Sequence, residues 1–299
     1  MQRQILTVHE HLGRGTLSFA NGTTAEYNSE IPALTRDLEL LSVQTGRKVT
    51  GAVLYPQMPY LRYSHPGEYD VSTDQINRSF FAMVDRWKAP FAQYPFIYLR
   101  VKDPFPVNRG LLERYRGRYW GIKMHLDAEC ADVGLLLSSD VLTLAQEFHL
   151  PITVHGSRAG GMLDFPKIRD SLFEEISRRQ IRFNIAHAGF LHPEAAIAQI
   201  PDTVYFDLSP LGIIRDQYLL QHQSQAQLFD ALLKIFENHP TAVMYGGDYP
   251  YNCQVWEDGS RHGLDRKEEL TLLQQFLTSV TAEQKDAFYC QNAQAFLGL

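Results

Sequence analysis

The sequence predicts a closed (β/α)8 barrel of the α/β class, a parallel sheet with outer helices built by a single domain over residues 1–299. Eight short runs of β-branched and aliphatic residues alternate with segments whose apolar residues recur at three and four, the spacing of an amphipathic helix. This repeated order favours a barrel over an open doubly wound sheet. No GxGxxG or GxxxxGKS/T motif follows the early strands, which argues against a nucleotide-binding sheet.

The elements follow one another along the whole chain. The predicted strands cover residues 5–11, 49–56, 96–101, 119–126, 151–157, 181–189, 204–209 and 242–250. Crossover helices are predicted at 31–47, 140–150, 165–180 and 224–239, and helices at 266–280 and 282–299 would complete the outer ring. Two segments rich in proline and aromatic residues, 55–70 and 102–110, follow strands and are predicted to be loops at the C-terminal face.

Composition excludes several classes of protein. With 44% hydrophobic and 21% charged residues, the chain resembles soluble globular proteins, and its 28 Lys and Arg are scattered around a net charge of −6, so no nucleic-acid surface is expected. No apolar run reaches the ~20 residues that span a bilayer, and no signal peptide is evident. Three widely spaced cysteines without a CxxC motif indicate a reducing cytoplasm. A small-molecule substrate is the expected partner, and a homo-oligomer is possible.

The first strand carries two histidines in the pattern HxH. Side chains alternate along a strand, so His9 and His11 point to one side and Glu10 to the other, toward the helices, where a polar partner must compensate its burial. The spacing excludes the metalloprotease helix, because HExxH needs histidines four apart.

Four predicted strands place metal-binding residue types at the same end of the barrel. His155 ends the fifth strand, His187 lies near the end of the sixth, and Asp248 near the end of the eighth. A single histidine at a strand end is more often structural, but barrel active sites form at the C-terminal rim, where these residues meet His9 and His11. Imidazole and carboxylate donors suit Zn²⁺ and neighbouring divalent ions.

Six segments carry a family resemblance: "VHEHLG", "GIKMH", "VHGS", "IAHAG", "GGDYP" and the closing "NAQAFLGL". In this order they resemble the amidohydrolase superfamily, in its branch of small metal-dependent hydrolases, decarboxylases and lactonases that includes aminocarboxymuconate semialdehyde decarboxylase. The resemblance implies one divalent ion, Zn²⁺ before Mn, Fe or Ni, held by His9, His11, His155 and Asp248. It implies that Asp248 also accepts a proton and that His187 is a second-metal ligand or polarises substrate or water.

The fourth strand presents Lys123 and His125 on one face. By the same resemblance, Lys123 is a carboxylated bridge to a second metal, a contact for a substrate carboxylate, or an ordinary interior lysine, and we favour the contact. Arg14 and Arg158, which follow strand ends, would also suit a carboxylate, although solvated loop charge explains most such residues. Tyr55 would wall the pocket or merely pack.

Three functions fit these residues. The first is a metal-dependent hydrolase that uses metal-activated water on an ester, lactone or amide bond of a small, carboxylate-bearing metabolite. The second is a metal-dependent, non-oxidative decarboxylase of an aromatic or unsaturated carboxylic acid. The third is a barrel that binds an anionic ligand without metal or turnover.

Overall fold

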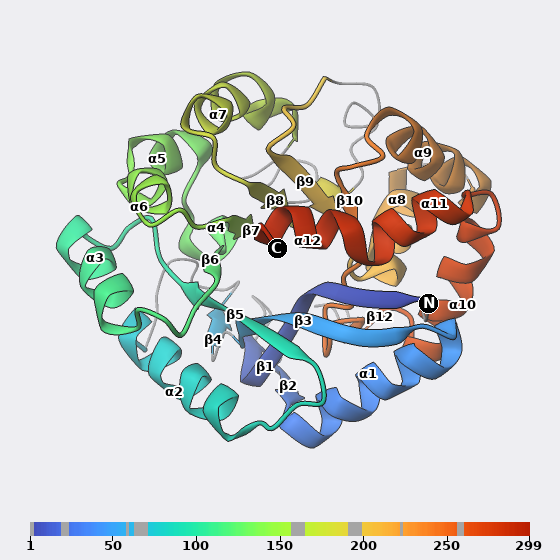
Figure 1. The fold of residues 1–299 in the computed structure, drawn as a ribbon, viewed down its shortest axis with the longest axis horizontal. Coiled ribbons are helices and arrows are strands. Elements are labelled where there is room, and N and C mark those ends of the chain that lie inside the picture. Colours follow the sequence, from blue (N-terminus) through green and yellow to red (C-terminus); the bar gives the residue numbers. More distant parts are fainter. Residues whose placement is uncertain are drawn as a thin grey trace.

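The computed structural model describes residues 3–18, 24–57, 60–62, 71–156, 165–190, 199–221, 224–255 and 260–299. Parallel strands form a ring with helices outside it (Figure 1). The strands are β1 (Gln4–Ser18), β3 (Lys48–Pro56), β5 (Ala92–Tyr98), β6 (Gly121–Met124), β7 (Ile152–Val154), β8 (Phe183–Ile185), β9 (Val204–Asp207) and β10 (Val243–Met244). They are paired in this order, so each predicted strand is present.

Backbone hydrogen bonds between β1 and the residues that follow β10 close the barrel. The Val8 amide donates to the Tyr245 carbonyl over 3.0 Å, and the His11 amide donates to the Tyr249 carbonyl over 3.0 Å. An isolated parallel bridge joins Glu10 to Tyr249 at the same seam. The predicted (β/α)8 barrel is therefore confirmed.

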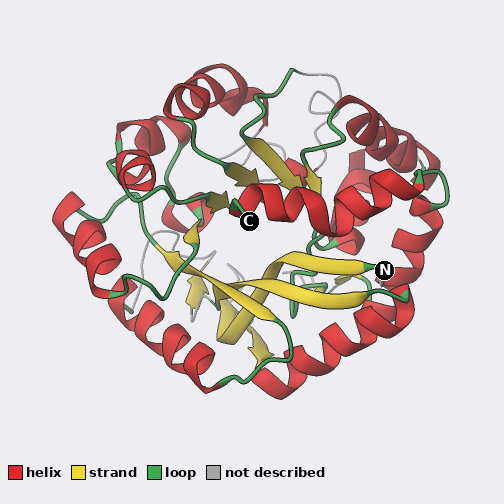
Figure 2. Cartoon of the chain, viewed as in Figure 1, coloured by secondary structure: helices red, strands yellow, loops and turns green. Residues whose placement is uncertain are grey.

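Helices surround the sheet, most of them on its outside (Figure 2). They are α1 (Ile31–Thr45), α2 (Thr73–Arg86), α3 (Phe105–Arg114), α4 (Leu126–Glu129), α5 (Val133–Ser138), α6 (Val141–Glu147), α7 (Phe165–Arg179), α8 (Leu211–Gln221), α9 (Gln225–Asn238), α10 (Arg266–Leu277), α11 (Ala282–Asp286) and α12 (Asn292–Leu297), with a 3-10 turn at Ala186–Phe190 and a π-helix at Ala287–Gln291. Among the described residues, no helix combines the length and apolar character needed to cross a membrane.

The two predicted loops contain regular structure. Helix α3 begins inside the segment 102–110. A proline is tolerated in its first turn, because the backbone amide that proline lacks would have no hydrogen-bond partner within the helix at that position. Within 55–70, β4 (Tyr60–Arg62) pairs with the C-terminal end of β1, while 58–59 and 63–70 lie outside the described residues. The same end of β1 also pairs with β2 (Thr24–Ser29). A hairpin of β11 (Cys253–Val255) and β12 (Arg261–Gly263) follows β10.

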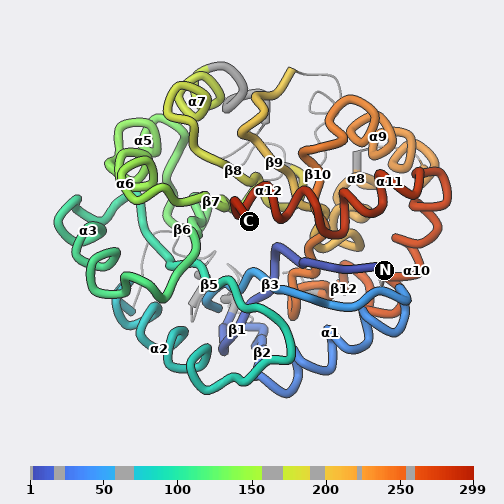
Figure 3. Tube along the Cα trace, in the orientation of Figure 1, coloured from blue at the N-terminus to red at the C-terminus, as the bar shows by residue number. Residues whose placement is uncertain are grey.

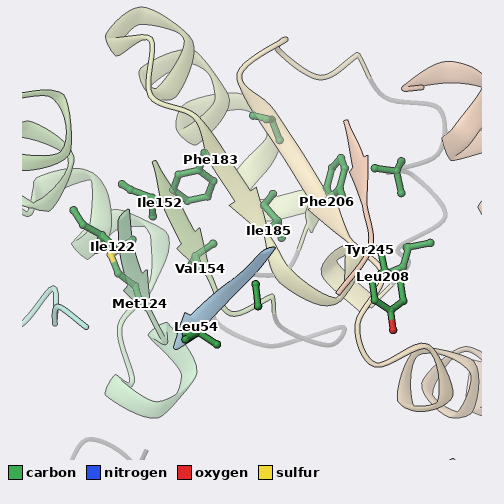
Figure 4. Packing of buried hydrophobic residues seen from close by; sticks show 14 of the residues in the cluster. Leu54, Ile122, Met124, Ile152, Val154, Phe183, Ile185, Phe206, Leu208 and Tyr245 are labelled. Carbon is green, nitrogen blue, oxygen red and sulfur yellow. The ribbon is translucent and has the colours of Figure 1, made fainter. Parts of the chain in front are cut away.

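Apolar side chains fill two layers. The larger layer lies between strands and helices, where Ile122, Ile152 and Phe183 pack from neighbouring strands (Figure 4). The second lies inside the barrel and includes Leu6, Val8 and Phe96 from the strands and Phe296 from α12. Helix α12 crosses the barrel axis in the view of Figure 3, so the C-terminus closes one end of the barrel. The prediction that this last segment completes the outer ring was therefore wrong for α12, because its apolar side chains pack into the barrel interior.

Candidate metal centre

His9 and His11 face one another inside the barrel. The pairing of β1 with β3 shifts in register between Thr7 and Glu10. This irregularity interrupts the alternation of side chains, so that His9 and His11 face the barrel interior although Val8 also does. Their Nε2 atoms lie 3.3 Å apart. The other nitrogen of each ring is already engaged, because His9 Nδ1 lies 3.2 Å from Asp207 Oδ2 and His11 Nδ1 lies 3.2 Å from the Pro56 carbonyl. Both Nε2 atoms therefore point into the same space inside the barrel, where they could share a ligand.

Asp248 completes this donor set. Its Oδ1 lies 3.4 Å from His9 Nε2 and 3.3 Å from His11 Nε2, and its Oδ2 lies on the side of His187, 3.9 Å from Nδ1. Burial alone would raise the pKa of this carboxyl, but His9, His11 and His187 reverse the direction and lower it. The ionised carboxylate and the two imidazoles form a group that can hold a metal ion.

A second set of histidines adjoins the first. The rings of His9 and His187 stack with centroids 5.0 Å apart, and His187 Nε2 lies 3.0 Å from His155 Nδ1. His155 in turn stacks on His125, with centroids 3.8 Å apart and planes at 15°. Five histidines, two from β1 and three from the residues that directly follow β6, β7 and β8, thus form one continuous cluster, which includes every histidine that the sequence nominated for the site.

Burial keeps most of these imidazoles neutral. Burial, with help from the Lys123 ammonium, lowers the pKa of His9 to about 3 against the opposing pull of Asp207. Burial likewise lowers the pKa of His11 and holds those of His125 and His155 well below the usual range. Because only the neutral ring offers a lone pair, this environment prepares the cluster to bind a cation.

Lys123 extends into the same space from β6. It is only 4% exposed, its Nζ lies 3.3 Å from His9 Nε2, and it lies 4.4 Å from the centroid of the Tyr55 ring. Burial lowers its pKa to about 8, although Asp207 and Asp248 oppose the shift. Within the described part of the chain, no carboxylate oxygen lies within 4 Å of this ammonium group. The barrel therefore holds a buried cation that no acid neutralises by direct contact.

Asp207, at the end of β9, contacts the histidine cluster and was missed by the sequence reasoning. Its Oδ2 receives a hydrogen bond of 2.7 Å from Asn184 Nδ2, and its Oδ1 receives bonds from Ser209 Oγ and, over 3.1 Å, from the His187 amide. Together with the contact to His9 Nδ1, these bonds fix both ring orientation and tautomer. The signal was available, since Asp207 is an acid near the end of the predicted strand 204–209.

Glu10 lies on the opposite side of β1, as the alternation predicted. It is fully buried, receives hydrogen bonds from Thr7 Oγ1 (2.7 Å) and the Tyr249 amide (3.1 Å), and lies 3.7 Å from Arg266 of α10. Burial raises the pKa of Glu10 to about 8, partly offset by Arg266. Arg266 is therefore the expected compensating partner from the helix layer.

Of the remaining predicted substrate residues, Tyr55 contacts the histidine cluster and Arg14 does not. The Arg14 guanidinium is at the surface, 77% exposed, and pairs with Glu30, so the structure does not bring it to the cluster. Tyr55 is fully buried beneath the histidines, its hydroxyl 2.7 Å from the Val8 carbonyl and 2.8 Å from Thr153 Oγ1. Arg158 lies outside the described residues.

The donor set fits a divalent metal ion. His9, His11 and Asp248 offer two imidazole nitrogens and a carboxylate oxygen whose partners on the far side are already fixed. Barrel and donor set together define a metal-dependent enzyme with its site at the C-terminal rim of the strands. A sequence model described as amidohydrolase matches residues 70–299, so the chain belongs to the amidohydrolase family.

Solved structures share the fold at low sequence identity. Dihydroorotase from Campylobacter jejuni is 14% identical, with a TM-score of 0.59 over 100% of this chain and 84% of that one. 5-Carboxyvanillate decarboxylase from Sphingomonas paucimobilis is 13% identical, with a TM-score of 0.58 over 100% of both chains. 4-Oxalomesaconate hydratase from Rhodopseudomonas palustris is 11% identical, with a TM-score of 0.54 over 98% of this chain and 95% of that one. A search of curated proteins finds no match.

Proposed function

We propose that the protein is a hydrolase that cleaves an ester, lactone or amide bond in a small, carboxylate-bearing substrate. The arrangement of Asp248 carries this proposal. One carboxylate oxygen lies 3.4 Å from His9 Nε2 and 3.3 Å from His11 Nε2, while the other lies 3.9 Å from His187 Nδ1. Because its two oxygens face different partners, the Asp248 carboxylate can bind a metal through one oxygen and accept a proton at the other.

The residues that would hold the metal are His9, His11 and Asp248, together with His155. A divalent ion bound there lowers the pKa of water toward ~7 and polarises a carbonyl group. Nitrogen and oxygen donors of this kind favour Zn²⁺, and Mn, Fe and Ni ions are alternatives. Carboxylation of Lys123 would add an anionic oxygen ligand and allow a second ion.

The proposed reaction moves one proton between water and the leaving group. Water oxygen forms a bond to the acyl carbon while Asp248 Oδ2 accepts the proton that the water loses. When the carbon–oxygen or carbon–nitrogen bond breaks, Asp248 returns that proton to the leaving atom. His187 is held by its Nδ1 contact with the Ser209 carbonyl, which assigns the lone pair to Nε2, so this ring can also accept a proton.

Lys123 supports an acidic substrate. A buried ammonium without an acid beside it is unfavourable, and a substrate carboxylate would supply the missing partner through a charge-assisted hydrogen bond. Its stacking against Tyr55 holds the ammonium on the inner face of the barrel, next to His9.

A decarboxylase is the second candidate, and an aromatic wall favours it. The Tyr251 ring meets His11 edge-on with centroids 5.3 Å apart, and Tyr27 packs on Tyr251 at 4.7 Å. A planar, unsaturated acid would pack against such rings. In that reaction the carbon–carbon bond to the carboxylate breaks, CO₂ leaves, and the carbon that keeps the electron pair takes a proton.

Oxygen isotopes separate the two reactions. Zinc-loaded protein is incubated in ¹⁸O-water with lactones, N-acyl amino acids and aromatic carboxylates, and the products are examined by mass spectrometry with parallel CO₂ detection. We expect ¹⁸O in the product carboxylate without release of CO₂, and we expect Asp248→Asn to abolish this ¹⁸O incorporation. Release of CO₂ without ¹⁸O in the organic product would overturn the hydrolase and establish the decarboxylase. Binding of these anions without turnover by zinc-loaded protein would leave only the ligand-binding barrel.

A further inference from the structure

A buried ionic network lies behind the proposed ligands, on the helix side of β1. Arg266, at the first position of α10, donates to Asp37 Oδ2 of α1 from Nε (3.0 Å) and from its terminal nitrogen (2.5 Å). The same guanidinium lies 3.4 Å from Glu269 and 3.7 Å from Glu10. All four side chains are buried, the most exposed at 7%. We call Glu10, Asp37, Arg266 and Glu269 the ionic clamp.

The ionic clamp forms hydrogen bonds with the backbone on both sides of Asp248. Arg266 donates to the Gly247 carbonyl over 3.3 Å, and Glu10 accepts the Tyr249 amide over 3.1 Å, so both neighbours of Asp248 are held. A Cβ on Gly247 would lie 2.3 Å from both the Arg266 guanidinium and the Glu10 carboxylate. The second glycine of "GGDYP" is therefore required because the clamp approaches the chain this closely.

The backbone of Asp248, which these hydrogen bonds flank, is strained. Asp248 has φ of 53°, in the left-handed region that side-chain-bearing residues seldom adopt. Such a conformation persists only where the surroundings over-determine it, and the backbone on either side of Asp248 is fixed by clamp contacts. Glu10 also sits between His9 and His11 in the chain, so one carboxylate links the strand that carries both histidines to the loop that carries the aspartate.

We infer that the ionic clamp positions the metal site, with Arg266 as the positioning residue that holds Asp248 at its distance from His9 and His11. This inference rests on the ligand set of the proposed function and not on the reaction. It extends the site to helices α1 and α10, which contribute none of the proposed ligands. Loosening the clamp is expected to weaken metal affinity even though the proposed ligands stay intact.

Zinc affinity of full-length variants tests the inference. Apo protein is titrated with Zn²⁺ against a chelator of known affinity, without substrate, and thermal unfolding of the apo protein is followed in parallel. We expect Arg266→Gln to weaken zinc binding roughly 10- to 100-fold, the range seen when groups that support metal ligands are removed. Asp37→Asn, which loses part of the Arg266 contact on α1, is expected to cause a smaller loss in the same direction.

Arg47→Gln is the matched control. Arg47 is also a buried arginine, 5% exposed, paired with Asp286 over 2.7 Å and lying over Tyr289, but no clamp residue contacts it in the described structure. It should lower the unfolding temperature and leave zinc affinity within about twofold. Equal zinc affinity in Arg266→Gln, Asp37→Asn and wild type would overturn the inference, as would an equal loss in Arg47→Gln. If Arg266→Gln fails to fold, Asp37→Asn decides alone.

A ligand control separates this inference from the proposed ligand set. The His9→Ala, His11→Ala double variant should lose zinc binding whether or not the clamp matters. Normal zinc binding by that variant would refute the ligand set itself. Loss in the double variant with normal binding in both clamp variants would refute the clamp alone.

Discussion

Glu129 should make the stability of the protein fall between weakly acidic and neutral pH. This side chain of α4 is fully buried, and its Oε2 receives a long hydrogen bond of 3.4 Å from the Lys102 amide. Its Oε1 has no hydrogen-bond partner within normal bonding distance among the described residues, although the backbone at Lys102 and Val101 approaches the carboxyl. Burial therefore raises the pKa of the Glu129 carboxyl from 4.5 to about 7, although Arg100 pulls the other way.

The sign follows from proton binding. Between pH 4.5 and about 7 the folded protein holds the Glu129 proton and the unfolded chain does not, so the stabilisation present below pH 4.5 is lost as the pH rises. At 1.36 kcal/mol for each pH unit, the interval corresponds to about 3 kcal/mol of unfolding free energy. The neutral amide in Glu129→Gln cannot ionise, so the variant lacks this contribution.

Urea unfolding of wild type and Glu129→Gln, in steps from pH 5 to 8, measures the effect. The wild-type free energy minus that of the variant should decrease by about 2–3 kcal/mol over this range and level off near pH 8. In the control Glu147→Gln, the lost carboxyl is exposed and has its pKa lowered by Arg109, so its difference should stay flat over the same range. A flat difference for Glu129→Gln as well would refute the assignment of a buried, neutral carboxyl.

Three further substitutions probe the site. Asp207→Asn should weaken zinc affinity about 10- to 100-fold, because the amide no longer fixes the His9 tautomer; unchanged affinity in chelator competition would contradict this role. Lys123→Met should raise the unfolding temperature, since it removes a buried cation that has no carboxylate in direct contact among the described residues, and should raise KM for acidic substrates; a lower unfolding temperature would argue that the cation is stabilised in the folded protein. Gly247→Ala should destabilise the protein by roughly 2 kcal/mol because its Cβ meets Arg266, and wild-type stability in urea would disprove that contact.

The sequence predicted the features that depend on local pattern and on topology. Apolar runs located the strands, and side-chain alternation separated His9 and His11 from Glu10. The convergence of Asp248 on the first strand followed from barrel closure, because parallel strands present their C-terminal ends at one rim. The same rule places Asp207, at the end of the seventh barrel strand, at this rim. The sequence reasoning overlooked this acid, which follows Tyr205 and Phe206.

Other contacts depend on tertiary packing that no local pattern reveals. Arg266 and Asp37 lie 229 positions apart on two helices whose sequences carry many charges, so only the packing of α10 near α1 singles this pair out. Arg14 was expected near the substrate because it follows the strand-one histidines. Strand β1 instead continues to Ser18 and pairs with β2, which carries Arg14 to the surface beside Glu30.

Metal analysis of the purified protein tests the central claim most directly. After reconstitution and removal of excess ion, wild type should retain about one equivalent of Zn²⁺ or Mn²⁺, and the His9→Ala, His11→Ala double variant should retain none while keeping the circular dichroism of a folded barrel. Failure of the folded wild type to bind any divalent ion at micromolar concentration would contradict the metal centre described here.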